Sequence, residues 1–310
     1  MNKMNARDGE PRGWRPVDAP QRPLLFINPA SGGGTASRVG LGEKAEALGI
    51  RCVALEPGDH LAALVQEGIA AGADALGMAG GDGSMAIVAA AASDHGLPFV
   101  CVPAGTRNHF ARDLGVARDD PIGALAAFTE GVERRIDVGE VGGHVFLNNI
   151  SIGIYGDAVQ RPSYRSAKLR TLLETADPVQ GPSAAAPPLR IVDDRGHEHS
   201  QPAVLLVSNN PYALERPLVA GTRPRLDTGR LGVVLLARPS EPPHRAGRAW
   251  TAARLDVGAG AAVHAGRDGE AITLDPPLHF ASIPGALRVR IATRHAHARR
   301  AEPGRITHTV

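Results

Sequence analysis

The chain has 310 residues, of which 43% are hydrophobic and 21% charged, the balance of a folded soluble protein with room for two domains. Its formal net charge of +2 is too small to indicate a nucleic-acid partner. No run of about 18 apolar residues occurs, so the sequence predicts no transmembrane segment, and we expect any membrane contact to be made from its surface. Two isolated cysteines exclude a disulfide framework and indicate a cytoplasmic location.

The first part of the chain alternates apolar runs with helical patterns. Residues 1–22 are polar and proline-rich and predict a disordered lead. Residues 23–133 then carry four runs that are apolar throughout, each followed by a helical pattern, which is typical of an α/β domain with a parallel sheet covered on both faces. The predicted strands are 24–28, 51–55, 75–79 and 99–102. The predicted helices are one that ends near residue 48, then 60–71, 85–92, 110–114, and one from Asp120-Pro121 to about residue 129.

The rhythm changes after residue 133. The segment RRIDVGEV-GG-HVF alternates as a hairpin would, with Gly142-Gly143 at its turn. Short strands separated by turn residues then predict a mainly antiparallel β-sandwich domain over residues 134–291. The remaining predicted segments are helices at 164–175 and about 244–255, and a basic, disordered tail at 292–310.

Three glycine-rich loops follow strands of the predicted parallel sheet: NPASGGGT (28–35), GGDGS (80–84) and PAGTRN (103–108). In such sheets ligands bind beyond the carboxyl ends of the strands, where glycine lets backbone N–H groups approach an anion and the next helix points its positive end. We therefore predict that the loops bind the phosphates of a nucleoside triphosphate. The candidate binding residues are Asn28, Ser31, Gly32, Gly80, Gly81, Asp82, Gly83, Ser84, Thr106, Arg107 and Asn108.

Asp82 is the sharpest feature of these loops. A carboxylate beside phosphates is repulsive unless a metal ion or a proton transfer is involved, so Asp82 predicts a magnesium ion or a catalytic role. The alternative is an Asp-Gly turn that caps the next helix. In the third loop, Arg107 could neutralise charge on a transferred phosphoryl group. Thr106 and Asn108 could bond phosphate or ribose, serve as the N-cap of the following helix, or do both.

Other nucleotide-binding motifs can be tested against the sequence. The P-loop needs Gly-Lys-Ser/Thr, and none of the three lysines follows a glycine or precedes a hydroxyl residue. The protein-kinase HRD and DFG signatures are absent. Residues 81–86 fit the dinucleotide pattern G-x-G-x-x-A, but the next strand ends in PFVCVPAG, without the carboxylate that would bind ribose, so this interpretation is a minor one.

Taken together, the three loops resemble the catalytic domain of diacylglycerol kinases and their relatives, the sphingosine, ceramide and bacterial lipid kinases. The segments FLNNISIGIYGDAV, PRLDTGRLGVV and HAGRDGEAI are similar to later motifs of the same family, so the resemblance covers about residues 24 to 291. The motifs are specific as a group, although GGDG also occurs in NAD kinases and phosphofructokinases.

The resemblance implies an α/β nucleotide-binding domain, a β-sandwich domain, and a cleft between them that holds ATP and the acceptor. It implies that the GGDG residues and Thr106 bind the ATP phosphates, with Mg²⁺ as the accompanying cation. It also implies that Glu270 is the general base for the acceptor hydroxyl, with Asp82 as the replacement candidate; without the resemblance, Asp268-Gly-Glu270 would be an exposed hairpin turn. The implied acceptor is a lipid such as diacylglycerol, met by a cytoplasmic protein at the inner membrane surface. A homodimer is left open.

The chain departs from the family pattern at two places. His109 stands where family members commonly carry an aspartate after the loop asparagine. In the metal-binding loop, Asp227 remains, but Thr228 and Gly232 stand where carboxylates are common. Thr228 cannot replace a carboxylate ligand at equal strength, so we expect no tightly bound structural magnesium at Asp227.

The leading hypothesis from the sequence is an ATP-dependent lipid kinase. An NAD-kinase-like or polyol phosphotransferase on the same nucleotide domain remains an alternative. So does a protein that senses ATP without turnover, which the altered metal loop would allow.

Overall fold

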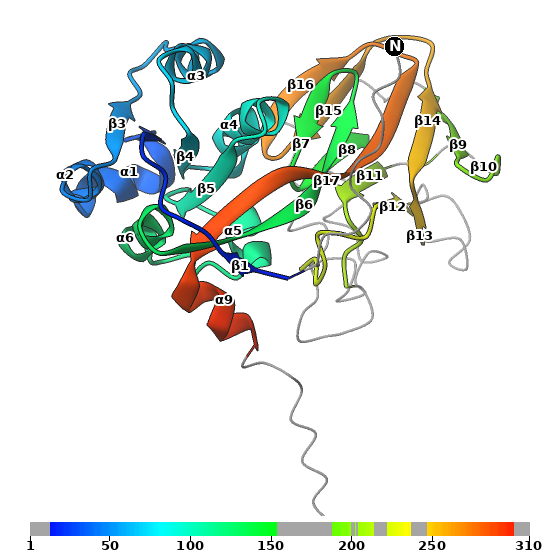
Figure 1. Ribbon diagram of the computed structural model, residues 1–310. Coiled ribbons are helices and arrows are strands. Elements are labelled where there is room, and N and C mark those ends of the chain that lie inside the picture. The colour runs from blue at the N-terminus through cyan, green and yellow to red at the C-terminus, as the bar shows by residue number, and fades with distance from the viewer. Residues whose placement is uncertain are drawn as a thin grey trace, which may run out of the picture.

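The computed structural model describes residues 13–153, 188–199, 202, 204–213, 222–236 and 247–300. Within these ranges two sheets and a set of helices make up the fold (Figure 1). The helix predicted over residues 164–175 lies outside the described residues, as does nearly all of the loop predicted after it.

The N-terminal half is a parallel sheet with helices packed on it, as predicted. Its strands are β2 (Pro23–Ile27), β3 (Arg51–Ala54), β4 (Ala75–Gly80) and β5 (Pro98–Pro103), and they lie side by side in the order β3-β2-β4-β5. The inner three are buried at every residue, which explains why their sequences are apolar throughout. The helices are α1 (Ser31–Arg38), α2 (Leu41–Glu46), α3 (Leu61–Ala70), α4 (Asp82–Asp94), α5 (His109–Leu114) and α6 (Pro121–Ala124), the last continued by a 3₁₀ turn over Leu125–Phe128.

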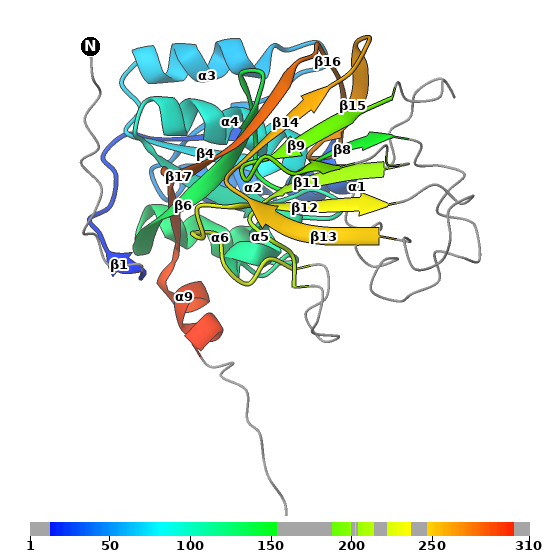
Figure 2. The same cartoon turned by 90° about the vertical axis from the view of Figure 1, so that its right-hand side faces the viewer.

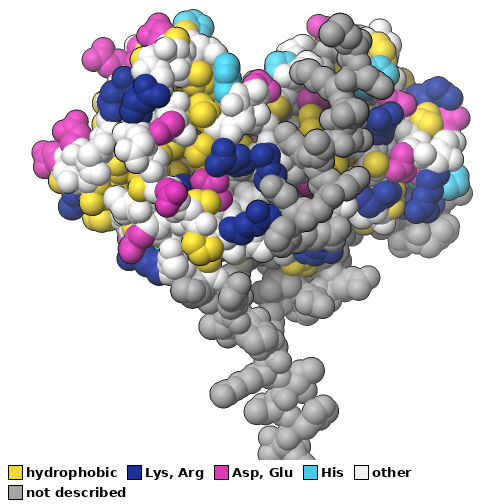
Figure 3. Space-filling model, viewed as in Figure 1, with side chains coloured by type: hydrophobic (Ala, Val, Ile, Leu, Met, Phe, Trp, Pro, Cys, Tyr) yellow, Lys and Arg dark blue, Asp and Glu magenta, His cyan; other side chains and the backbone are white. Residues whose placement is uncertain are grey.

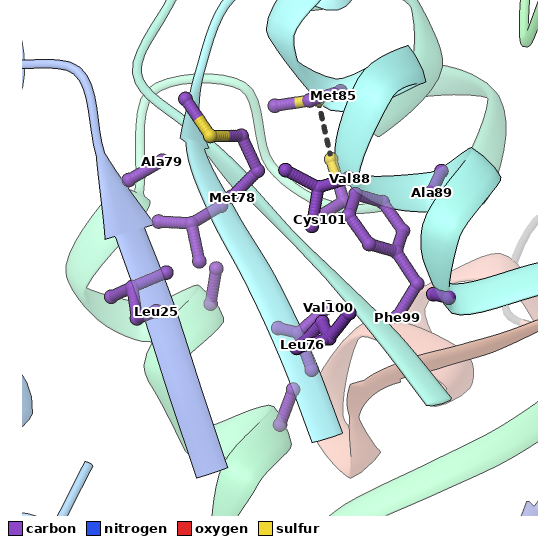
Figure 4. Packing of buried hydrophobic residues seen from close by; sticks show 14 of the residues in the cluster. Leu25, Leu76, Met78, Ala79, Met85, Val88, Ala89, Phe99, Val100 and Cys101 are labelled. Atoms are coloured by element: carbon purple, nitrogen blue, oxygen red, sulfur yellow. Dashed lines mark hydrogen bonds between the residues drawn. The ribbon is translucent and has the colours of Figure 1, made fainter. Parts of the chain in front are cut away.

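The core of this half is closely packed between β4, β5 and α4 (Figure 4). Leu76, Met78 and Val100 are completely buried, and the Sγ atom of Cys101 lies 3.3 Å from the Sδ atom of Met85. Burial raises the pKa of the Cys101 thiol well above its usual range, so this cysteine is an inert core residue.

Two long strands, β6 (Gly131–Val141) and β17 (Leu278–Ala292), join the two halves of the molecule. Through residues 288–290, β17 pairs in parallel with β5. It also pairs with β6 along most of its length and with β14 (Arg254–Gly258) near its start, both antiparallel. The first sheet therefore grows to 11 strands and takes one of its inner strands from near the C-terminus. The predicted domain boundary after residue 133 falls inside β6.

A second, antiparallel sheet of six strands faces the extended part of the first, as Figure 2 shows. Between the two sheets lies a separate apolar core, in which the rings of Phe146 and Phe280 meet edge to face with centroids 6.5 Å apart. The predicted β-sandwich is confirmed. In sheet order, the strands are β13 (Gly247–Ala252), β12 (Leu231–Leu236), β11 (Val204–Asn209), β8 (Asn149–Gly153), β15 (Val263–Arg267) and β16 (Glu270–Leu274), opposed by β6, β7 (His144–Phe146), β9 (Arg190–Asp193), β14 and β17, with β10 (Glu198–His199) at the edge.

Local predictions in the second half have mixed outcomes. The β6–β7 hairpin turns at Gly142 and Gly143, whose φ angles of 55° and 80° suit glycine. The helix predicted at 244–255 is wrong, because its described residues belong to strands β13 and β14. In β14 exposed and buried residues alternate, with Leu255 and Val257 facing the sandwich core, so burial on a sheet overrides the helix propensity of this alanine- and arginine-rich stretch.

The two ends of the chain also need correction. Residues 1–22 were predicted to be disordered, but from Gly13 on they are part of the fold. Strand β1 (Arg15–Pro16) pairs with β6, and the guanidinium of Arg134 lies over the Trp14 ring, with 4.9 Å between Cζ and the ring centroid. In the tail predicted to be disordered, Thr293–Arg300 form helix α9. Arg294 in α9 contacts the Asp120 carboxylate at 2.8 Å. Residues 1–12 and 301–310 lie outside the described part.

The face of the molecule seen in Figure 3 does not single out one class of partner. In the view of Figure 3 basic and acidic side chains are interspersed, and the outline is notched at the top between the α3 and β16 sides of the molecule. Among the described helices, none combines the length and the hydropathy needed to cross a bilayer.

Candidate active site

The three glycine-rich loops come together because β2, β4 and β5 are neighbours in the sheet. A Cβ atom on Gly105 would lie 2.6 Å from the Cα atom of Gly81, and one on Gly32 would lie 2.5 Å from the carbonyl oxygen of Ala104. The loops therefore touch through their backbones, and only glycine fits at these contacts. The sequence predicted the loops at one sheet edge; the structure brings them into direct contact.

The first loop is shaped by its glycines. Gly32, Gly33 and Gly34 all have left-handed backbones, with φ of 56°, 64° and 81°, so the helix begins properly only after them. Asn28 Oδ1 accepts from the backbone N–H of Ala30 at 3.1 Å, which turns the chain at the strand end. Ser31 lies across from Gly81, since a Cβ on that glycine would be 3.7 Å from Ser31 Oγ.

The second loop leads straight into α4. Gly80 lies beside Asn28 and Ser84, whose Cβ atoms would each be 3.6 Å from a Cβ added to it. Asp82 is the first residue of α4, and its Oδ2 and Oδ1 accept the backbone N–H groups of His109 and Phe110 at 3.1 and 3.0 Å. Asp82 therefore caps α5, the helix after the third loop, and not α4 as the sequence alternative supposed. Each carboxylate oxygen keeps acceptor capacity for a further ligand.

The third loop is braced by Asn108. This residue has a left-handed backbone (φ 51°), and its side chain bonds the N–H and carbonyl of Gly105 and the carbonyl of Arg118. It occupies the N-cap position of α5, but the capping bonds come from Asp82. Asn108 thus holds the loop shape. Thr106 is exposed and Arg107 is partly exposed at the tip of the loop.

Glu270 reaches this site from the opposite sheet. It follows the β15–β16 turn, where Asp268 and Gly269 have φ of 47° and 98°. A Cβ atom on Gly83 would overlap the Glu270 carboxyl group, so that carboxyl lies directly against the first turn of α4. Glu270 is half-exposed, and Arg267 Nη2 lies 3.9 Å from its Oε2. The predicted base and the predicted phosphate loop are therefore neighbours.

Asp268 is a site residue that the sequence did not single out. Its buried carboxylate accepts the backbone N–H groups of Leu147, Asn148 and Asn149 at 2.7, 2.7 and 3.0 Å. Burial raises the pKa of Asp268 to about 6, against the opposing effect of these three donors. These bonds anchor the turn that presents Glu270. Only the Asp-Gly pair at a hairpin turn hinted at this in the sequence.

The loop around Asp227 does not fit a structural metal site. Asp227 Oδ1 accepts from Arg225 Nε at 3.0 Å. Thr228 donates both its N–H and its hydroxyl to Asn210 Oδ1, at 2.9 and 2.6 Å. Asp137, the other carboxylate here, receives two backbone N–H groups at 2.7 and 2.9 Å. These oxygens accept from protein donors, and the described residues contain no group of three or more His, Cys, Asp or Glu suited to a metal.

His109, at the position where the loop resemblance predicts an aspartate, lies in the first turn of α5. Neither ring nitrogen has a hydrogen-bond partner among the described residues. Burial lowers the pKa of His109, and the neighbouring Asp82 carboxylate opposes that shift. Burial therefore favours the neutral imidazole over its cation.

Residues 22–141 match the family described as the diacylglycerol kinase catalytic domain. These residues are similar to a diacylglycerol kinase catalytic domain. The match confirms the resemblance seen in the loop motifs. The matched stretch, called the kinase domain below, contains all three glycine-rich loops. Glu270, on β16, and Asp268, in the β15–β16 turn, lie outside it in the sandwich.

Curated relatives carry corresponding names. A probable lipid kinase YegS-like protein of Pseudomonas aeruginosa is 37% identical over 141 residues, 44% of this chain and 45% of that protein. A diacylglycerol kinase of Bacillus subtilis is 39% identical over 77 residues, 24% of this chain and 25% of that protein. The chain thus aligns with less than half the length of either relative.

The fold extends beyond the kinase domain. The crystal structure of a diacylglycerol kinase from Bacillus anthracis superposes with a TM-score of 0.63 over 89% of this chain and 98% of that one, at 17% identity. The two proteins therefore share the whole architecture, including the sandwich that carries Glu270.

Proposed function

We propose that the protein is an ATP-dependent lipid kinase that transfers the γ-phosphate of ATP to a lipid hydroxyl, such as that of diacylglycerol. The kinase domain and the relatives named lipid kinase and diacylglycerol kinase support this. The observation that carries it is Glu270 lying against Gly83. A nucleotide loop alone serves binding, whereas a carboxylate beside it can also take a proton from an acceptor hydroxyl.

Each part of the site has a task in this reaction. The glycine loops and the N-terminal end of α4 hold the ATP phosphates, and Thr106 and Arg107 add a hydroxyl and a cation. Mg²⁺ bound with ATP neutralises phosphate charge, and Asp82 is the carboxylate that would hold it, which fits a cation that uses one or two carboxylates with phosphate oxygens and water. Glu270 accepts the proton as the acceptor oxygen bonds to the γ-phosphorus and the bond from that phosphorus to ADP breaks.

The test is to incubate the protein with labelled ATP and a total lipid extract and to identify the labelled product. A labelled phospholipid supports the proposal, and its structure names the acceptor. Labelling of NAD or a polyol in parallel incubations would replace it with the phosphotransferase alternative. Saturable ATP binding with no transfer to any acceptor would favour a nucleotide sensor.

Gly81→Val should block ATP binding and leave the protein folded. The backbone of Gly81 is extended (φ −84°, ψ 172°) and a Cβ there meets only Ser31 Oγ at 3.7 Å, so valine fits the ligand-free protein. Its branched side chain would occupy the space of the phosphate oxygens. Calorimetric titration with ADP measures the effect. Unchanged affinity in a folded variant would remove Gly81 from the phosphate site.

Chelation of divalent cations should stop phosphate transfer, while the ligand-free protein should carry no tightly bound magnesium. The first follows from the charge of the ATP phosphates, and the second from Thr228 and Gly232, which stand where the family resemblance predicts carboxylates. Turnover in EDTA and metal analysis of desalted protein measure the two effects. A magnesium ion coordinated by Asp227 in a crystal of the ligand-free protein would contradict the second.

A further inference from the structure

A buried ion pair joins the kinase domain to the sandwich. Asp113 lies near the end of α5, and Arg223 lies 110 residues further on, in the segment before β12. Arg223 Nε donates to Asp113 Oδ2 at 2.7 Å, and the two side chains are 0% and 1% exposed. Burial alone would lower the pKa of Arg223, but the Asp113 carboxylate more than offsets this, so the pair stays ionised. A pair so completely removed from water needs bonds at its other donors as well.

Those other donors are bonded to the sandwich. Arg223 Nη2 donates to Asn148 Oδ1 at 2.6 Å. Nη1 donates to the carbonyl oxygen of Asn209 at 2.9 Å and also to that of Leu147. A planar guanidinium can donate to a carboxylate along one edge and to several carbonyl oxygens along the others. The three N–H donors of a lysine ammonium group all radiate from one nitrogen, so lysine cannot reach the same set of acceptors.

Arg223 and Asp268 both bond the segment of residues 147–149. Arg223 donates to a carbonyl and a side chain of this segment, and Asp268 accepts its backbone N–H groups. The carbonyl of Leu147 and the side chain of Asn148 face the guanidinium, while the N–H groups of both residues point at the Asp268 carboxylate. The peptide units are therefore held between a cation and an anion. Asp268 begins the β15–β16 turn that places Glu270 against the GGDG loop.

These contacts form a closed series of neighbouring groups, called the ring below, that runs from the GGDG loop to Glu270 and back. On the kinase-domain side, Asp82 of the GGDG loop caps α5, and α5 carries Asp113. We propose that Arg223 is a positioning residue: its guanidinium fixes the distance between the GGDG loop and the Glu270 carboxyl group at which phosphate transfer takes place. This inference rests on the proposed function, because it takes Glu270 as the base. In order, the ring is Asp82, α5, Asp113, Arg223, residues 147–149, Asp268, Glu270 and Gly83.

Arg223→Lys in the full-length protein tests the proposal. Lysine keeps the positive charge but lacks the planar set of guanidinium donors, so Glu270 should be misplaced. We expect kcat to fall about tenfold to a hundredfold, while ADP affinity stays within about threefold of the parent. The matched control is Arg230→Lys, which alters an arginine that bonds Asp194 at 3.2 Å and the backbone and side chain of Thr251, outside the ring. It should keep the parental kcat. A parental kcat in Arg223→Lys as well would overturn the proposal.

A second readout separates positioning from mere stability. If Arg223 acts through Glu270, then adding Arg223→Lys to Glu270→Gln should lower the residual rate by less than about twofold, because effects on one catalytic unit are not additive. A further loss as large as in the parent would overturn the proposal. Should Arg223→Lys fail to fold, the pair Asp113→Leu with Arg223→Met removes both charges of the ion pair together. A low kcat in that folded double variant supports the proposal, and a parental one overturns it.

Failure of the proposed function would look different. If the parent transfers no phosphate to any acceptor, the kinase proposal fails, and the ring is then judged by structure alone. A crystal structure of Arg223→Lys should then show Glu270 displaced from Gly83. Glu270 unmoved against Gly83 would overturn the positioning role.

Discussion

Glu270→Gln should lower turnover by about two to four orders of magnitude, the usual scale for a lost general base. Glutamine keeps the size and most of the hydrogen bonding of glutamate, but it cannot accept a proton at neutral pH. The amide would fill the space that the carboxyl group now occupies against Gly83. ATP affinity should barely change, because the phosphate loops belong to the kinase domain and Glu270 to the sandwich. Steady-state kinetics and ADP titration measure the two quantities.

The matched control is Glu67→Gln on the exposed face of α3, which should leave both quantities unchanged. If Glu270→Gln keeps turnover within a few-fold of the parent, Glu270 is only part of a hairpin turn. A large loss of ATP binding would instead place Glu270 in the nucleotide site. Asp82 would then be the candidate for the base.

Asp82→Asn should lower turnover by about 10²–10³-fold, the scale for one lost electrostatic contact to a transition state. The structure adds an effect on stability. Asparagine can accept one of the two α5 N–H groups, but its NH₂ group would face the other, so about 1 kcal/mol of capping free energy should be lost. The protein should still fold. Denaturant unfolding and turnover, measured on the same preparation, separate the two effects.

Asp120→Ala is the matched control for the capping effect. Asp120 caps α6 by accepting the N–H of Gly123 at 2.7 Å, outside the three loops and far along the chain from Glu270. It should show a similar loss of stability with parental turnover. If Asp82→Asn likewise keeps near-parental turnover, Asp82 is a capping residue and no more.

Much of the first half was predictable because its signals are local. A strand buried on both faces is apolar throughout, and a loop that receives phosphate needs glycine at fixed positions. The strands from Leu24 to Val102 and the three loops were therefore placed correctly. So was the Asp120 cap of α6, the last helix of this half. The order of these elements also implied that the loops share one sheet edge.

The errors arose where distant contacts outweigh local propensity. Alanine and arginine in 244–255 favour a helix in isolation, but the described residues of this stretch pair with β12, β9 and β17 and bury every second side chain of β14. The lead carries no apolar pattern, yet Trp14 and β1 are held by β6. In neither case does the local sequence identify the strand that the segment pairs with.

By itself, the sequence determined the kinase-domain loops and the chemistry they can support, since backbone approach to phosphate depends on residue type at neighbouring positions. It could not show that Asp82 bonds the N–H groups of α5, that Asp268 anchors the turn before Glu270, or that Arg223 and Asp113 form a buried pair. Each of these contacts joins residues 27 to 121 positions apart. Only the folded chain brings them within hydrogen-bond distance, and removal from water is what makes such contacts strong enough to position a catalytic group.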